Sequence, residues 1–357
     1  MKPLSERIHK YSVETQVLDL NETPAPQNEK VKADLNKLVE SIRTAHAASR
    51  PVICAIGAHT IRNGLGPVLA RLMEKGLITH LATNGAGIIH DWEFSYLGKT
   101  CEDVEHYTSR GEFGNWEETG RYLNLALVVG AYDGLGYGES IGRMIEEEGL
   151  AIPSEEALID EVRKTVPSDP EQAAAAADLL WAVRKFSLEP GRLSIPHPWK
   201  QYSAQAAAYR NKVPFTGHPM IGHDIIYSHP MNHCASLGRC AERDFLAFAN
   251  NVSRIDGGVY LSIGSAVMSP MIFEKSLSMA RNLVHQRGEK ITNHSIFVAD
   301  LAESSWDWSK GEPPIDNPAY FLRYNKTFSR MGGSMCYMQI HNRQLLLNLA
   351  QSLLTES

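Results

Sequence analysis

The sequence has few cysteines, no cluster of basic residues and no long apolar run, and each absence excludes a class of protein. Five cysteines among 357 residues, odd in number and scattered, favour reduced thiols over a disulfide framework. The formal net charge of -6, with no run of Lys or Arg, argues against a nucleic-acid partner. No window approaches the roughly 18 apolar residues that a membrane span requires, and residues 1–16 contain no apolar signal segment. We therefore expect a cytoplasmic protein that contacts neither nucleic acid nor membrane.

The standard signatures of nucleotide-binding and zinc proteins are also missing. The sequence contains no GxGxxG, no Walker lysine after a glycine-rich turn, and no HExxH or CxxC pair. Any nucleotide or metal site therefore has to be recognised from the order of the secondary-structure elements and from individual side chains.

The chain divides into a polar, proline-containing arm at residues 1–30 and a single α/β domain at residues 31–357. Short apolar runs of strand length occur at 51–57, 77–83, 257–264 and 294–300. Helical periodicity fills the stretches between them, as at 63–76 and 270–285. Strands that alternate with helices form parallel sheets, because a parallel pair needs a crossover connection. We predict a doubly wound, mostly parallel sheet of the Rossmann type, with helices on both faces.

Three turns of small and polar residues follow expected strands, at residues 57–60, 84–87 and 264–266. In an open parallel sheet, ligands bind beyond the carboxyl ends of the strands, where backbone N–H groups suit a pyrophosphate. These turns favour a nucleotide or another phosphate-bearing cofactor. The alternative is that their glycines only make tight turns between a strand and a helix.

Four segments resemble the deoxyhypusine synthase family. ICAIGAHTIRNGLGPVLARLMEKGLITHLATNGAGIIHDWE is similar to its N-terminal core, with the NAD-binding turns, and three later segments follow: NKVPFTGHPMIGHDIIYSHP, GGVYLSIGSAVMSPMIFEKSLSMARN and IDNPAYFLRYNKTFSRMGG. The resemblance implies a Rossmann-type fold, NAD as cofactor, a small-molecule amine as substrate, and a homotetramer with active sites between subunits.

The resemblance and the three turns together place the NAD contacts on ten residues. These are His59, Thr60, Thr83, Asn84, Gly85, Ala86, Gly87, Asp91, Gly264 and Ser265. In the family, an acidic pair that helps hold the polyamine precedes the retained Asp, whereas this sequence has Ile89 and His90 there. The amine is therefore expected to differ from spermidine, and His90 is a candidate substrate contact.

The last of the four segments resembles the stretch around the imine-forming lysine of the family and places that role on Lys326. A lysine forms an imine when burial or nearby cations keep part of it neutral. Arg323 lies three residues before Lys326, and aromatic residues lie on both sides. The alternative is a surface lysine in a loop.

Residues 218–240 contain the densest run of potential metal ligands, because four of the 14 histidines lie within 16 residues. Their spacing matches no metal-site signature, so no metal is expected. We expect His218 to line the substrate pocket, and His223 and Asp224 to act as acid and base. One alternative makes His218, His223, His229 and His233 the ligands of a metal, and another gives these histidines only capping or packing roles.

The segment SRGEFGNWEETGRYLN, residues 109–124, combines an aromatic side chain with paired carboxylates. Trp116, Glu117 and Glu118 suit the pocket of a cationic substrate. The alternative is the N-terminal turn of a helix, where acidic residues interact favourably with the helix dipole.

Taken together, these features predict an NAD-dependent amine alkyl transferase of the deoxyhypusine synthase type. NAD takes a hydride from a polyamine-type amine, and the alkyl group passes through Lys326 to an acceptor amine. Two alternatives remain: a metal-assisted hydrolase that uses the histidines of residues 218–240, and a non-catalytic nucleotide-binding oligomer.

Overall fold

The fold is built on one six-stranded sheet. The computed structural model describes residues 1–354, and its sheet has the strand order β10-β9-β8-β2-β3-β7, with every neighbouring pair parallel. The strands are β2 (Val52–Ile56), β3 (His80–Asn84), β7 (Phe215–His218), β8 (Val259–Ile263), β9 (Ser295–Asp300) and β10 (Ser334–Gln339). All four predicted strands are confirmed, and β7 and β10 were not among them.

Helices cover both faces of this sheet, so the predicted doubly wound α/β fold is confirmed. Alternate residues of β2 enter two separate cores: Cys54 belongs to one, and Ile53 and Ala55 to the other. The first core is closed by α2 (Glu29–Ala47), α4 (Gly66–Glu74), α5 (Gly85–Leu97) and α15 (Asn342–Leu354). The second is closed by α12 (Cys234–Val252), α13 (Met268–Gln286) and α14 (Arg323–Ser329). Burial on both faces explains why the central strands are continuously apolar.

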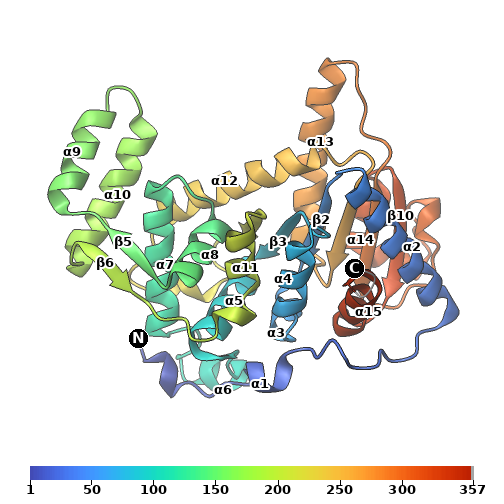
Figure 1. Ribbon diagram of the computed structural model, residues 1–357, viewed down its shortest axis with the longest axis horizontal. Helices are drawn as coiled ribbons and strands as arrows, with labels where there is room; N and C mark the ends of the chain where they lie inside the picture. The colour runs from blue at the N-terminus through green and yellow to red at the C-terminus, as the bar shows by residue number, and fades with distance from the viewer. Residues whose placement is uncertain (355–357) are drawn as a thin grey trace.

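A helical layer is inserted between β3 and β7. It comprises α6 (Val104–Ser109), α7 (Glu117–Tyr132), α8 (Tyr137–Glu147), α9 (Glu155–Thr165), α10 (Pro170–Phe186), α11 (Ala204–Asn211) and the antiparallel pair β5 (Gly149–Ile152) and β6 (Gly191–Ser194). Side-chain caps begin two of these helices, since Ser154 accepts from Ala157 N–H and Asp169 from Gln172 N–H. Helices α9 and α10 project from one end of the molecule (Figure 1). Within residues 1–354, no helix is both long and apolar enough to cross a membrane.

The first 28 residues pack on the body of the chain, whereas a polar arm outside the domain was predicted. Leu4, Val13 and Leu18 are each at most 4% exposed. The segment also contains β1 (Tyr11–Ser12), which pairs with β4 (Lys99–Thr100), and α1 (Val13–Gln16). The prediction failed because three widely spaced apolar side chains anchor a segment that is polar on average.

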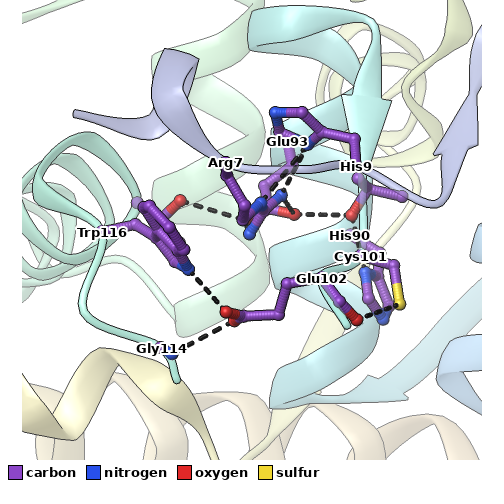
Figure 2. Close-up of polar contacts among 10 residues, drawn as sticks. Arg7, His9, His90, Glu93, Cys101, Glu102, Gly114 and Trp116 are labelled. Carbon is purple, nitrogen blue, oxygen red and sulfur yellow. Dashed lines mark hydrogen bonds and ion pairs between the residues drawn. The ribbon is translucent and has the colours of Figure 1, made fainter. Parts of the chain in front are cut away.

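A buried ion pair joins this N-terminal segment to α5. Two guanidinium nitrogens of Arg7 donate to the carboxylate of Glu93 at 2.8 and 2.7 Å, and both side chains are 1% exposed. The hydroxyls of Thr100 and Thr119 donate to the same carboxylate at 2.5 and 3.0 Å. Figure 2 shows Arg7 between Glu93 and the ring of Trp116, whose centre lies 5.7 Å from the guanidinium carbon. Every oxygen of the buried carboxylate therefore has a donor.

Electrostatics set the charge state of this pair. Burial by itself would raise the pKa of Glu93, but the charge and hydrogen bonds of Arg7 outweigh it and lower the pKa to about 2. The ionised carboxylate therefore stabilises the native state above its ordinary pKa of about 4, and this contribution is lost as the pH falls from about 4 to about 2.

We expect Glu93→Gln to lower the free energy of unfolding by about 3–5 kcal/mol, because it leaves the Arg7 charge buried without a counter-charge. The measurement is urea unfolding at neutral pH. The double variant Arg7→Met/Glu93→Leu removes both charges and is expected to lose less stability than Glu93→Gln alone. A single variant as stable as the wild type would show that the pair contributes nothing.

Candidate functional site

The order of the strands reverses between β2 and β8. From β2 the chain adds β3 and then β7 on one side, and from β8 it adds β9 and β10 on the other. This is the order of Rossmann-type sheets, in which each half binds one nucleotide beyond the carboxyl ends of its strands. The turns that follow β2 and β8 touch, since a Cβ on Gly57 would lie 2.0 Å from the carbonyl oxygen of Gly264. Two of the three predicted turns therefore meet at the point of reversal.

These two turns present backbone donors that lack acceptors. In the part of the chain that the structure describes, the amide N–H groups of Ala58, His59, Ser265 and Ala266 donate to no protein atom. The hydroxyl of Thr60, in the same turn as His59, is fully buried and has no partner either. Several unpaired amides in one place suit an anionic group such as a pyrophosphate.

The glycines of the third turn make room for groups of the protein itself. The side-chain oxygen of Asn84 accepts from Gly87 N–H at 3.0 Å and caps α5. A Cβ on Gly87 would lie 2.1 Å from the hydroxyl of Thr83, and one on Gly85 would lie 2.1 Å from the carboxylate of Asp224. For these residues, the structure favours the tight-turn alternative over contacts with a cofactor.

Asp224 lies where α5 begins. Burial raises its pKa to about 6, although Tyr227 donates a hydrogen bond to it at 3.2 Å. Within residues 1–354, the buried hydroxyl of Tyr137 has no hydrogen-bond partner, and the charge of Asp224 acts on it. A carboxyl group of this kind exchanges its proton close to neutral pH, as acid–base catalysis requires. The sequence pointed to Asp224 but carried no signal for the two tyrosines, which come from α8 and from the 3-10 turn Ile225–Ser228.

Lys326 is attached to the other half of the sheet. Its ammonium nitrogen lies 3.7 Å from a carboxylate oxygen of Glu312 and 3.5 Å from the ring centre of Tyr320, and its side chain is 16% exposed. Both partners come from the segment between β9 and β10, whereas Asp224 packs on the helix after β3. Strands β9 and β3 are three places apart, about 15 Å at the usual spacing. The predicted catalytic residues therefore belong to opposite halves of the sheet. Lys326 lies on one half, and His223 and Asp224 lie on the other.

Asp91 and His90 are paired within the protein, which corrects their predicted roles. Asp91 is 1% exposed, and its carboxylate accepts from the Ser203 hydroxyl and from Ala204 N–H at the start of α11. A nitrogen of His90 lies 2.8 Å from the Thr100 hydroxyl, next to the buried ion pair, and burial lowers the pKa of His90 to about 4 (Figure 2). Asp91 holds two helices together, and His90 faces the N-terminal segment.

The predicted cation pocket of Trp116, Glu117 and Glu118 is also corrected. Trp116 is 1% exposed and donates its ring N–H to Glu102 at 2.9 Å. Glu118 accepts from the backbone N–H of Leu4 at 2.6 Å. The two glutamates form the first turn of α7, so the alternative of a helix N-terminus is confirmed.

The histidines of residues 218–240 do not gather around a common centre. Each has different surroundings: His229 lies 3.3 Å from Glu117, His233 lies 3.7 Å from Asp178, His218 is buried beside β3, and His223 is exposed. Among residues 1–354, no three His, Cys, Asp or Glu side chains are grouped so as to hold a metal ion. The hydrolase alternative therefore lacks its metal ligands.

Comparisons with known proteins give distant structural likenesses. No protein-family model and no curated protein matches the sequence. Among solved structures, AgrE in complex with ornithine and NAD+ has a TM-score of 0.49 and 13% identity, over 93% of this chain and 34% of AgrE, so this chain spans about a third of that protein. A putative LOR/SDH protein from Methanococcus maripaludis S2 has a TM-score of 0.44 and 10% identity, over 93% and 72% of the two chains. A putative deoxyhypusine synthase from Entamoeba histolytica has a TM-score of 0.43 and 7% identity, over 91% and 89%.

We expect Asp224→Asn to be more stable than the wild type above about pH 6 and equally stable near pH 4. The folded pKa lies above the unfolded value, so ionisation of the buried carboxyl costs native-state stability that grows between these two pH values, by about 1–3 kcal/mol. Urea unfolding between about pH 4 and pH 7 measures the difference. Glu303→Gln, which removes an exposed carboxylate, is the control. A difference between Asp224→Asn and wild type that does not change with pH would contradict this assignment.

Proposed function

We propose that the protein binds NAD across the carboxyl edge of its sheet and uses it to oxidise a small amine. One observation supports the cofactor above all: the turns after β2 and β8 touch where the strand order reverses, and both have amide N–H groups that no atom of residues 1–354 accepts from. A pyrophosphate over these turns would join two nucleotides, one on each half of the sheet. When bound, NAD would accept a hydride from the carbon next to the amine nitrogen.

The residues at this edge fit a dinucleotide, with one departure. Gly264 leaves the space of a Cβ open for the close approach of a ligand, and the buried hydroxyl of Thr60 has no partner among the described residues. The acidic residue that commonly binds a ribose at the end of the second strand is Asn84 here, and its side-chain oxygen is occupied by the cap of α5. The proposed site therefore has no carboxylate at this position to repel the 2′-phosphate of NADP.

We expect Ala266→Glu to weaken NAD binding by at least about tenfold. Ala266 is exposed in the turn after β8, so the change leaves the core intact and places a negative charge where the pyrophosphate would lie. Isothermal titration calorimetry measures the affinity. The matched control is Ala48→Glu, which adds the same charge at an exposed position after α2, at the opposite edge of the sheet, and is expected to bind as the wild type does. A wild type that binds no NAD, or an equal loss in both variants, would overturn the proposal.

Lys326 is the residue that we assign to the oxidised amine. Its side chain is mostly buried, and Glu312 and Tyr320 hold its terminal nitrogen in place on the second half of the sheet. In the proposed step, this nitrogen attacks the substrate carbon that the oxidation has joined to nitrogen by a double bond. Hydride removal from a neutral amine leaves the substrate as a protonated imine. One proton passes from the neutral nitrogen of Lys326 to the substrate nitrogen, which leaves as a free amine, so a protonated imine on the lysine replaces that of the substrate and atoms and charge balance.

We expect borohydride to fix substrate carbon onto Lys326 in the presence of NAD and a reactive amine, tested with 1,3-diaminopropane, putrescine and cadaverine. Mass spectrometry of peptides locates the label. Lys326→Arg keeps the positive charge but forms no imine, so it is expected to remain unlabelled. Lys310→Arg, an exposed lysine of the same segment with 71% of its side chain accessible, is expected to label as the wild type does. No label with any of these amines, or a label that survives in Lys326→Arg, would exclude the proposed step.

A further inference from the structure

Three polar side chains form a line on the face of the sheet that α12 covers, outside the two cofactor turns. His80 is the first residue of β3, and Thr216 and His218 belong to β7. The hydroxyl of Thr216 lies 2.9 Å from Nε2 of His80 and 2.9 Å from Nε2 of His218. The three residues are 0, 1 and 8% exposed, and the ring of Phe248 meets both imidazoles edge-on, at centroid distances of 5.4 and 5.3 Å. One hydroxyl thus links two imidazoles in an otherwise apolar place.

The shared hydroxyl couples the tautomers of the two rings. Burial lowers the pKa of both His80 and His218 to about 3, so each ring is neutral near pH 7 and carries one N–H. A hydroxyl has a single hydrogen, so Thr216 donates to one ring and accepts from the other. One histidine therefore has its hydrogen on Nε2, and the other has it on Nδ1.

The surroundings of His80 decide the direction of the two hydrogen bonds at the Thr216 hydroxyl. Its Nδ1 is buried and has no hydrogen-bond partner among the described residues, and the positive charge of Arg254 acts on the ring. A bare nitrogen near a cation costs less than a buried N–H group without an acceptor. His80 therefore donates from Nε2 to Thr216, Thr216 donates to Nε2 of His218, and His218 carries its hydrogen on Nδ1.

We propose that His218 uses this Nδ1–H group to bind a ribose hydroxyl of the nucleotide held by the first half of the sheet, with Thr216 and His80 as positioning residues. The inference rests on the proposed binding of NAD. His218 ends β7 and is paired in register with Asn84, the residue that replaces the usual ribose-binding acid. In the described part of the chain, Nδ1 of His218 has no protein partner, and the side chain keeps 8% of its surface exposed. A neutral donor binds the oxygen without repelling a phosphate beside it.

The tautomer is tested first, without any ligand. In protein labelled with 15N-histidine, long-range 1H–15N correlation spectra show which ring nitrogen carries the hydrogen, and His218→Gln assigns the signal. We expect the Nδ1–H tautomer in the wild type and in Thr216→Ser, and a mixture in Thr216→Val, which keeps the shape of threonine but lacks the hydroxyl. An Nε2–H tautomer in the wild type, or an unchanged tautomer in Thr216→Val, overturns the positioning role.

The ribose contact is tested by calorimetric titration with NAD and with NADP. We expect His218→Phe to weaken NAD binding about tenfold, and His218→Gln, whose amide still donates, to recover part of the loss. The wild type is expected to bind NAD and NADP with affinities within about tenfold of each other, because the ribose-binding position after β3 carries the neutral Asn84 and not an acid. If the wild type binds NAD and His218→Phe binds it equally tightly, the ribose contact is overturned and the NAD proposal stands. A wild type that binds neither dinucleotide overturns both.

Discussion

The backbones that leave β2 and β8 touch at Gly57 and Gly264, where no side chain fits between them. Because both strands are buried at the centre of the sheet, this contact fixes the carboxyl ends of the two halves relative to each other. The chain then diverges, towards α4 on one face and α13 on the other. The turn after β2 therefore supplies no acceptor for the unpaired amides of the turn after β8, and the reverse also holds. The unpaired donors follow from the reversal of strand order, which is why we place the cofactor there.

Helix α5 explains why several predicted site residues turned out to be structural. Most of its first eleven residues are buried, so its polar side chains need partners inside the protein. Asn84 caps the helix itself, Asp91 binds the start of α11, and Glu93 binds Arg7 of the N-terminal segment. The helix thus supports the first half of the sheet through buried polar contacts, and few of its side chains remain available to a ligand.

The polar groups that remain available are divided between the two halves. The first half carries Asp224 and His218, beside α5 and at the end of β7, whereas Lys326 is held by the segment after β9. A ligand that spans the reversal point reaches both halves, as a dinucleotide does. In the proposed arrangement, the first half therefore binds a nucleotide and the second half carries the chemistry on the amine.

Local patterns determined much of this protein. Continuous apolar runs predicted four of the six strands of the sheet, because burial on both faces is encoded by neighbouring residues. SMCYMQ escaped prediction as β10, because its apolar and polar residues are mixed and no turn chemistry beyond two glycines marks it. The sequence also determined that the small-residue turns share one edge of the sheet, because the carboxyl ends of parallel strands lie together.

Only the tertiary structure decided which polar side chains are left for a ligand. Their partners are remote in the chain, 86 residues for Glu93 and Arg7, 112 for Asp91 and Ser203, and 136 for His80 and Thr216, and no local pattern encodes such pairings.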